Sequence, residues 1–239
     1  MTPNVFITGA DRGLGLGLCA GMLEQGWEVF AGQYTPAWAE LAGLAAQYPR
    51  SLRIIPLDVS SLESATQAAR SVEAIAEGLD MLINNAGVIS QTTAGSIRNP
   101  QDYTEMHRLY DINALGPLRV VQAFLPLADR GRLKRLCFVS SEAGSIARSE
   151  RTSWYGYCMS KSALNMGVKI LYNDLRPQGY TFRVYHPGWI RSYMFGTKNL
   201  EATQEPEEAA AKAIPFFLGP REDENILVMV DNEGNEWPW

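Results

Sequence analysis

The stretch Val5-Phe6-Ile7-Thr8-Gly9-Ala10-Asp11-Arg12-Gly13-Leu14-Gly15 passes from apolar residues through glycines into a second apolar run. Residues 4–8 are β-prone and predict a short strand, while Leu14, Leu18 and Met22 recur at helical spacing. Glycines let a backbone approach a ligand closely, and the first N–H groups of a helix attract phosphate. The stretch predicts a strand, a glycine turn and a helix, with a phosphate site where the helix begins. A ligand-free turn before a core helix is the alternative.

Strand-like and helical runs alternate along the rest of the chain. This alternation predicts an α/β protein with a parallel sheet covered on both faces, in which seven strands form one doubly wound Rossmann domain. No linker, repeat or low-complexity segment divides residues 1–239. Pro117 and Pro126 predict that the long helical run 101–128 is kinked or ends early. The predicted strands are 4–8, 28–33, 52–57, 79–84, 134–140, 181–186 and 225–230, and the predicted helices are 14–25, 37–47, 61–77, 101–128, 154–176 and 206–218.

Two later strands also end in polar residues. One leads into Asn84-Asn85-Ala86-Gly87, and the other leads into Ser140-Ser141. Parallel strands deliver the loops at their carboxyl ends to one ligand crevice. Each of these ends is compatible with an ordinary turn, but their shared position predicts a common site.

Tyr157 and Lys161 stand four residues apart in a predicted helix, so their side chains share one face. A phenol with a pKa of about 10 is a weak acid–base group at neutral pH, and a neighbouring ammonium group favours its phenolate form. The pair can therefore act as a proton donor held ready by a cation. Tyr-x-x-x-Lys also occurs by chance on surface helices, so the pair gains meaning from the other motifs.

In their order along the chain, these motifs resemble the short-chain dehydrogenase/reductase family. Pro187-Gly188 after the sixth predicted strand extends the resemblance over nearly the whole chain, and the ending Asn232-Glu233-Gly234-Asn235-Glu236-Trp237-Pro238-Trp239 is similar to the C-factor and sniffer branch. The resemblance implies an oxidoreductase that transfers a hydride between a nicotinamide cofactor and a carbonyl or alcohol. The motifs are Thr8-Gly9-x-x-x-Gly13-x-Gly15, Asn84-Asn85-Ala86-Gly87, Ser141-Glu142-Ala143-Gly144-Ser145-Ile146 and Tyr157-x-x-x-Lys161.

The resemblance implies a catalytic role for four residues. Tyr157 would be the general acid or base, and Lys161 would lower its pKa and hold the nicotinamide ribose. Ser141 would bind the substrate oxygen; the family's spacing to the following glycine favours it, although strand alternation alone allows Ser140. Asn113 matches the helix asparagine that ties the lysine to solvent through water.

The resemblance also implies a cofactor site along the strand ends. The second strand ends in Gln33 and lacks the carboxylate that binds the ribose 2′-hydroxyl of NAD, while Arg12 suits a 2′-phosphate. We therefore predict NADP, with NAD as the alternative. Asp58-Val59 match the pair that contacts adenine in the family. The predicted cofactor-binding residues are Thr8, Gly9, Asp11, Arg12, Gly13, Leu14, Gly15, Gln33, Asp58, Val59, Asn85, Ala86, Gly87, Tyr157, Lys161, Pro187, Gly188 and Ile190.

Composition limits the other partners. With 46% hydrophobic and 20% charged residues the chain is an ordinary soluble protein, and a net charge of -5 argues against nucleic acid or an anionic membrane as the main partner. Three cysteines without a Cys-x-x-Cys motif predict neither a disulfide framework nor a metal site, and Cys19 and Cys137 are expected in the core. The uncharged run 13–23 is too short to span a bilayer. We expect a cytoplasmic protein.

Two features concern the surface. The region 187–205 has no clear period and holds Trp189, Tyr193, Met194 and Phe195, so it is the predicted substrate lid, although packing alone is compatible. His107, His186 and Cys158 are expected to be surface or packing residues.

The family pairs the helices near 101–128 and 154–176 across a twofold axis. Leu164, Val168 and Leu171 are candidates for an apolar stripe on the second helix, and a homodimer or homotetramer is expected. A second function also stays open: a nucleotide-binding signalling or regulatory protein on the same scaffold with little turnover.

Overall fold

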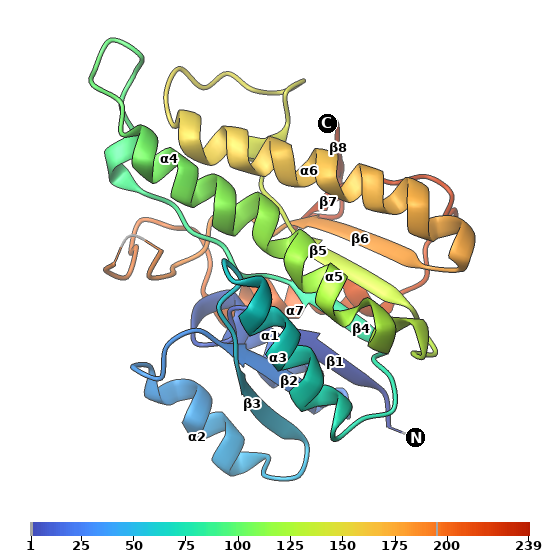
Figure 1. Ribbon diagram of the computed structural model, residues 1–239. Helices are drawn as coiled ribbons and strands as arrows, with labels where there is room; N and C mark the ends of the chain where they lie inside the picture. Colours follow the sequence, from blue (N-terminus) through green and yellow to red (C-terminus); the bar gives the residue numbers. More distant parts are fainter. Residues whose placement is uncertain (1, 195) are drawn as a thin grey trace.

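Strands and helices alternate as predicted, and the strands form one sheet with helices on both faces (Figure 1). The computed structural model describes residues 2–194 and 196–239, so Phe195 of the predicted lid lies outside the described residues. The strand order is β3-β2-β1-β4-β5-β6-β7-β8, with every neighbouring pair parallel except β7 and β8. The doubly wound α/β fold is confirmed. The sheet has eight strands instead of seven, because Glu236–Trp237 folds back antiparallel on β7.

Element boundaries lie close to the predicted ranges. The strands are β1 (Asn4–Ile7), β2 (Glu28–Gln33), β3 (Leu52–Pro56), β4 (Met81–Asn84), β5 (Arg135–Val139), β6 (Thr181–His186), β7 (Met229–Asp231) and β8 (Glu236–Trp237). The α-helices are α1 (Gly13–Glu24), α2 (Ala39–Gln47), α3 (Leu62–Glu73), α4 (Tyr103–Tyr110), α5 (Gly116–Asp129), α6 (Tyr155–Leu175) and α7 (Pro206–Leu218). The shorter helical turns are η1 (Gln91–Thr93), η2 (Asp111–Leu115), η3 (Glu142–Gly144) and η4 (Arg176–Gln178).

The last parallel strand begins later than predicted. Residues 225–228 form a loop instead of extending β7. Arg183, which is fully buried on β6, donates to both carboxylate oxygens of Glu224, at 2.6 and 2.8 Å. A buried guanidinium requires such a partner, because an unpaired charge in the interior is costly. This ion pair fixes the chain just before the strand.

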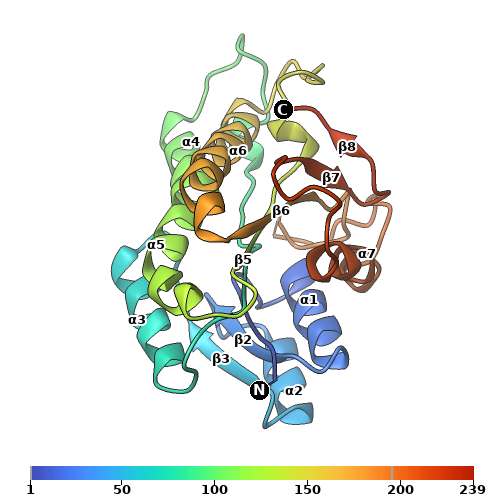
Figure 2. The same ribbon diagram turned by 90° about the vertical axis from the view of Figure 1, so that its right-hand side faces the viewer.

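Helices α3 to α6 lie on one face of the sheet and α1, α2 and α7 lie on the other (Figure 2). Glycines in α1 permit its close packing against α7. A Cβ atom at Gly17 would lie 2.9 Å from the Pro206 carbonyl oxygen, closer than real Cβ contacts come. Part of the glycine content of this helix therefore serves packing between helices. Cys19 and Cys137 are buried, as predicted.

The helical run 101–128 is interrupted, as predicted. Helix α4 continues into η2, a wider π-type turn, before α5 begins with Pro117 in its first turn. Proline is tolerated there, because the first N–H groups of a helix have no partner in the helix. Pro126 lies inside α5. Single π-type turns occur often at functional sites, and this one carries Asn113.

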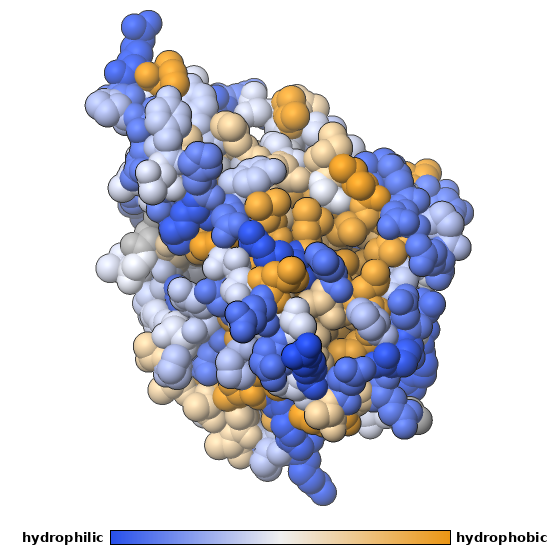
Figure 3. Space-filling model, in the orientation of Figure 1, coloured by the Kyte–Doolittle hydropathy of each residue, from blue (hydrophilic) through white to orange (hydrophobic). Residues whose placement is uncertain are grey.

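The prediction that Leu164 and Val168 belong to an exposed stripe is wrong. Both side chains are buried against the sheet, and Leu171 is half-buried against the same core. The exposed apolar positions of α6 include Met166 and Ile170, at 62% and 60% exposed. The 3.6-residue period puts the core positions on one side of the helix and these two on the other. Figure 3 shows hydrophobic side chains gathered on the face that carries α5 and α6.

Within residues 2–194 and 196–239, every helix is too short or too polar to cross a membrane.

Candidate active site

The loops after β1 and β4 are joined by a network of four hydrogen bonds. Thr8 Oγ1 accepts from the N–H groups of Asn85 and Ala86, at 3.0 and 2.9 Å. The Asn85 side-chain amide donates to the carbonyl oxygens of Thr8 and Gly9, at 2.9 and 3.1 Å. Because β1 and β4 are neighbours in the sheet, these bonds hold both loops at its carboxyl edge.

The glycines of the first loop are required by close approaches of backbone. Gly9 has a φ of +64°, and a Cβ atom there would lie 2.9 Å from the Ala86 Cα atom. A Cβ atom at Gly15 would lie 2.1 Å from the Gly9 carbonyl oxygen. Side chains at these positions would push the two loops apart.

The start of α1 fits a phosphate. Gly13 has a φ of +57°, and a Cβ atom there would meet Ser192 at 3.7 Å, which leaves room beside the turn. Arg12 is the N-cap residue, and it makes no side-chain capping bond to the helix. The first N–H groups of α1 are thus left for an anion, which the positive end of the helix dipole also favours. Leu14 is buried in the core beneath this turn.

The end of β2 is tied to the glycine turn by Asp11. This buried carboxylate accepts from the N–H groups of Tyr34 and Thr35, at 3.2 and 2.8 Å. Gln33, at the strand end, is half-buried and leads into this loop. The carboxylate of the turn is therefore engaged with the loop that would face the cofactor ribose.

Arg12 lies in an aromatic stack. Its guanidinium carbon is 4.5 Å from the centre of the Trp38 ring, and the Trp38 and Tyr193 ring centres are 4.8 Å apart. Tyr193 belongs to the predicted lid. A guanidinium over an indole ring is held by cation–π attraction and keeps its edges free for a phosphate. The stack joins the glycine turn, the loop after β2 and the lid.

The remaining predicted cofactor residues line the same edge. Asp58 accepts from the backbone and the hydroxyl of Ser60, at 2.9 and 2.6 Å, and Val59 packs in the core.

After β6, the Pro187 carbonyl oxygen accepts from the buried Gln204 amide at 2.5 Å. Gly188 has a φ of +76°, and a Cβ atom there would lie 2.6 Å from that amide nitrogen. Ile190 forms a backbone bridge with Gln204. The start of the predicted lid is therefore held by the Gln204 side chain together with backbone contacts to Gln204.

Tyr157 and Lys161 share one face of α6, as their spacing predicts. Burial raises the pKa of Tyr157 to about 12, although a hydrogen bond with the Ser141 side chain opposes the rise. Burial lowers the pKa of Lys161 to about 8. The Lys161 ammonium lies 5.9 Å from the centre of the Tyr157 ring and donates to the Val139 carbonyl oxygen at 3.1 Å. Burial is the largest cause acting on the phenol pKa in this structure, and the lowering of that pKa by Lys161 stays a prediction.

The two hydroxyls after β5 have different partners. Ser140 donates to the Asn165 side chain at 2.6 Å inside the protein. Ser141 caps η3, where its Oγ accepts from the Ala143 N–H at 3.2 Å, and it bonds to Tyr157. An accepting Oγ keeps its own proton for donation to a third group. The geometry therefore brings Ser141, and not Ser140, to the phenol.

Asn113 is buried in the π-type turn. Its side chain both donates to and accepts from the backbone of Val88, at 2.8 Å each, and also donates to Ser160 at 3.0 Å. A Cβ atom at Gly87 would lie 3.4 Å from the Asn113 side-chain oxygen and 3.5 Å from the Lys161 nitrogen. Asn113 and Lys161 thus flank Gly87 on its open side, and the asparagine fixes the loop after β4.

Sequence reasoning missed several residues around this group. Asn165 holds both Ser140 and the Gly144 carbonyl oxygen, and its place four residues after Lys161 is a signal that could have found it. Glu142 and Arg151 form an ion pair whose charges act on Tyr157. The sequence spacing of Glu142 and Arg151 matches no helix or strand repeat that would predict this ion pair.

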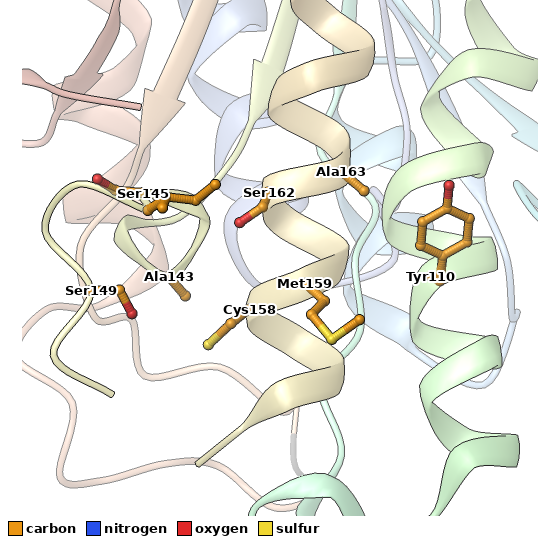
Figure 4. Close-up of a pocket in the computed structure, with 9 residues that line it drawn as sticks. Tyr110, Ala143, Ser145, Ser149, Cys158, Met159, Ser162 and Ala163 are labelled. Atoms are coloured by element: carbon orange, nitrogen blue, oxygen red, sulfur yellow. The ribbon is translucent and has the colours of Figure 1, made fainter. Parts of the chain in front are cut away.

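The other singled-out side chains lie elsewhere. His107 is exposed, and the His186 ring meets the Trp237 ring edge-on at 5.6 Å. Cys158 turns its sulfur toward the loop 143–149, on a different side of α6 from the predicted catalytic pair (Figure 4).

Known proteins share this sequence and fold. A sequence model described as short chain dehydrogenase matches residues 3–203. The C-signal protein of Myxococcus xanthus is 40% identical over 162 residues, which cover 67% of this chain and 93% of that protein. The NADPH-bound carbonyl reductase from chicken fatty liver superposes with a TM-score of 0.86 at 30% identity, over 100% of this chain and 99% of that one.

The carbonyl reductase Sniffer of D. melanogaster superposes with a TM-score of 0.87 at 26% identity, over 100% of both chains. The family match spans the glycine turn, the strand ends and the Tyr157–Lys161 helix. The chain therefore belongs to the short-chain dehydrogenase family and is an NAD(P)-dependent oxidoreductase of that family.

Proposed function

We propose that the protein transfers a hydride between NADP(H) and a carbonyl or alcohol substrate, with Tyr157 as the general acid or base. The observation that carries the proposal is the grouping of the Tyr157 phenol with the Ser141 hydroxyl beside the Lys161 face of α6. A reducing enzyme needs a proton donor and a hydrogen-bond donor at the developing alkoxide, and these two groups supply them.

The residues act in a balanced sequence. A nicotinamide bound at this site would supply the hydride for the carbonyl carbon, with the electron pair of the C=O bond moving to oxygen. Ser141 donates a hydrogen bond to that oxygen, and Tyr157 transfers its proton there to complete the alcohol. A pKa raised to about 12 keeps the phenol protonated at neutral pH before turnover, which suits the reducing direction. Lys161 would hold the ribose and balance the charge of the phenolate left behind.

The cofactor proposal combines charge with relatedness. The start of α1 fits a pyrophosphate, Gln33 offers no carboxylate to repel a 2′-phosphate, and Arg12 offers a guanidinium. The chicken carbonyl reductase structure contains NADPH, which supports NADP for this chain. The other predicted contacts, Asp58-Val59, Asn85 to Gly87 and Pro187 to Ile190, lie along the same sheet edge.

Residues 187–205 are proposed as the substrate lid of a single catalytic domain. The two limbs of this segment are tied together, since Arg191 donates to the Ala202 carbonyl oxygen at 2.8 Å and pairs with Glu205 at 3.1 Å. The segment exposes Trp189 and Leu200. Apolar side chains on a braced loop beside the cofactor crevice suit closure over a partly apolar substrate.

A homodimer or homotetramer is proposed through the outer faces of α4 and α6. Exposed Tyr103, Tyr110, Met166 and Ile170 lie on these two packed helices. Large apolar side chains gathered on one face are typical of an association surface. Light scattering at micromolar concentration tests this: a monomer contradicts it.

Steady-state turnover tests the central proposal. The full chain is assayed with NADPH and with NADH against a panel of aldehydes, ketones, diketones and quinones. We expect turnover with at least one carbonyl and a higher kcat/KM with NADPH. Tight NADPH binding without turnover across the panel would contradict the enzyme proposal. That result would favour the signalling alternative, for which the likeness to the C-signal protein is the supporting observation.

A further inference from the structure

The loop 141–149 connects the predicted catalytic serine to the region before α6. It begins with Ser141 and the η3 turn and continues to Ser149. On one side it rests on α6: the Gly144 carbonyl oxygen accepts from Ser162 and Asn165, at 3.2 and 3.1 Å. A Cβ atom at Gly144 would lie 2.9 Å from the Lys161 backbone. The start of the loop is thus pressed against the catalytic turn of the helix.

The other side of the loop is held by residues 237–239, which we name the strap. Ser145 Oγ donates to the Pro238 carbonyl oxygen at 2.5 Å, and the Ala147 N–H donates to the main-chain oxygen of Trp239 at 2.9 Å. The Arg148 guanidinium carbon lies 4.7 Å from the centre of the Trp237 ring. Three consecutive strap residues therefore contact three residues of one loop, although about ninety positions separate them in the sequence.

The strap is itself anchored to the sheet. Trp237 closes strand β8 against β7, and its indole N–H donates to the Asp231 carboxylate at 2.8 Å. This bond contributes to a lowered pKa of Asp231, which keeps the acceptor ionised. The Trp237 ring also packs edge-on against His186 at the end of β6. The strap is a fixed support and not a free tail.

Two short hydrogen-bonded turns connect the strap contact to Ser141. The Ser145 N–H donates to the Glu142 carbonyl oxygen at 2.9 Å, and the Gly144 N–H donates to the Ser141 carbonyl oxygen at 3.0 Å. Ser141 Oγ accepts from the Ala143 N–H. A displacement of Ser145 therefore carries the backbone of Ser141 with it, because turns of this kind deform little without breaking their bonds.

The loop has room to move if its hydrogen bonds to the strap break. A crevice of about 490 Å³ opens between residues 143–149 of the loop and α6 (Figure 4). Its lining includes Ser145, Ile146 and Ser149, and Ile146 is 77% exposed. Apolar packing does not fill this crevice. The outer part of the loop therefore depends on its hydrogen bonds to the strap.

We infer that the strap positions Ser141 for the reaction through Ser145, so that Ser145, Pro238 and Trp239 are positioning residues of the active site. The inference rests on the proposed function. A reaction that depends on a hydrogen bond from Ser141 to the substrate oxygen is sensitive to displacements well below 1 Å. Loosening the strap would lower the rate while the cofactor, which is held by the glycine turn, still binds.

Ser145→Ala removes one strap bond, together with the longer bond that Ser145 Oγ accepts from the Arg148 N–H at 3.3 Å, and keeps the loop sequence otherwise intact. We expect kcat to fall by up to about tenfold, the range of a single lost hydrogen bond, with the NADPH dissociation constant unchanged. Ser149→Ala is the matched control, because Ser149 is exposed on the same loop beyond the strap contacts, and it should keep the wild-type rate. Equal rates in Ser145→Ala and wild type contradict the inference.

A chain that ends at Trp237 lacks both main-chain acceptors and keeps the Trp237 anchor. We expect faster hydrogen exchange in residues 142–149 and a lower kcat, again with wild-type NADPH affinity. Faster exchange with an unchanged kcat/KM means that the strap serves packing only, and this overturns the inference. An inactive wild type contradicts the proposed function as well, so the two failures are distinguishable.

The pH profile adds a readout that a general loss of stability does not move. The Ser141 hydrogen bond opposes the rise in the pKa of Tyr157. With Ser141 displaced, the pH at which alcohol oxidation reaches half its maximum should rise in both variants. Of the other groups that act on the pKa of the phenol, Cys158 lies on α6 and stays in place, whereas Glu142 moves with the loop; the Ser141 bond has the larger effect of the two and sets the direction of the change. An unchanged profile counts against the inference.

Discussion

The two ends of the cofactor crevice are built in opposite ways. At the catalytic end, Ser141, Asn113 and Lys161 are buried, and each is held by hydrogen bonds to backbone. At the end where the 2′-phosphate would lie, Arg12 and Trp38 are only partly buried and are held by the faces of rings. Hydrogen bonds between buried groups fix a position narrowly, whereas ring stacking on the surface leaves it adjustable.

This difference between the two ends has consequences for the reaction rate and for the preference between NADPH and NADH. Buried polar groups act in a medium of low dielectric constant, where losing a partner is costly. Partly exposed groups also interact with water, so a single substitution there has a smaller effect on the free energy. Substitutions at the catalytic end should abolish the reaction, and substitutions at the phosphate end should shift the choice of cofactor.

The largest effect is expected for Tyr157→Phe. Removing the proton donor should lower kcat by about 10²–10⁴-fold, the usual contribution of general acid catalysis. The NADPH dissociation constant should stay nearly unchanged, because the glycine turn and Lys161 are the groups proposed to hold the cofactor. Steady-state rates and a fluorescence titration measure both quantities. A comparable loss of cofactor affinity would show that the phenol is a binding group and would weaken the contrast between the two ends.

Arg12→Ala tests the phosphate end. Loss of charge-assisted hydrogen bonds should cost about 1.5–3 kcal/mol, or roughly a tenfold to hundredfold loss in NADPH affinity. NADH binding should hardly change. Arg50→Ala is the control for charge, since Arg50 is exposed in the turn before β3. A wild type that binds NADH more tightly than NADPH would remove the basis of the assignment.

Burial of Lys161 predicts a pH-dependent stability. Its pKa falls from 10.5 to about 8 in the folded chain, so between these values the unfolded chain binds more protons and the free energy of unfolding rises with pH. Below this window, the folded chain bears the full cost of the buried charge. The free energy of unfolding of Lys161→Met minus that of wild type should therefore fall by about 2 kcal/mol between about pH 7 and about pH 9.5.

Urea unfolding of both cofactor-free proteins measures this difference. Tyr157 stays protonated in the folded chain over this range, because its pKa is raised to about 12. Parallel stability curves for the two proteins would mean that the ammonium is solvated, and that the catalytic end is less closed than its burial indicates.

The smallest effect is expected for Gln33→Asp. A carboxylate at the end of β2 can accept a hydrogen bond from the ribose 2′-hydroxyl and repels a 2′-phosphate, so preference should move toward NADH by a factor of about ten. Dissociation constants for both cofactors decide this, with Gln47→Asp as a control at the end of α2. If the affinities for NADPH and NADH fall together, the Gln33 side chain supports the loop and does not discriminate between the two cofactors.

Local sequence was sufficient for the parts of the site that lie within one element. Gly9, Gly13 and Gly15 predicted the first turn: close backbone approaches exclude larger side chains at Gly9 and Gly15, and a positive φ favours glycine at Gly13. The four-residue spacing of Tyr157 and Lys161 fixed their common face through the helical repeat alone. The same periodicity was less informative on the outer face of α6, where it could not tell Leu164 on the core side from Met166 on the exposed side.

Contacts between distant segments were decided by the tertiary structure. The sequence by itself determined the doubly wound order of strands and helices, the glycine turn and the Tyr157–Lys161 pair, since each depends on spacing within a few residues. Only the folded chain decided that Ser141 meets the phenol, that Trp38 stacks on Arg12, and that Pro238 and Trp239 support the serine loop. These pairings have no periodic signature, because they depend on how the strand ends and the β7–β8 turn come together in space.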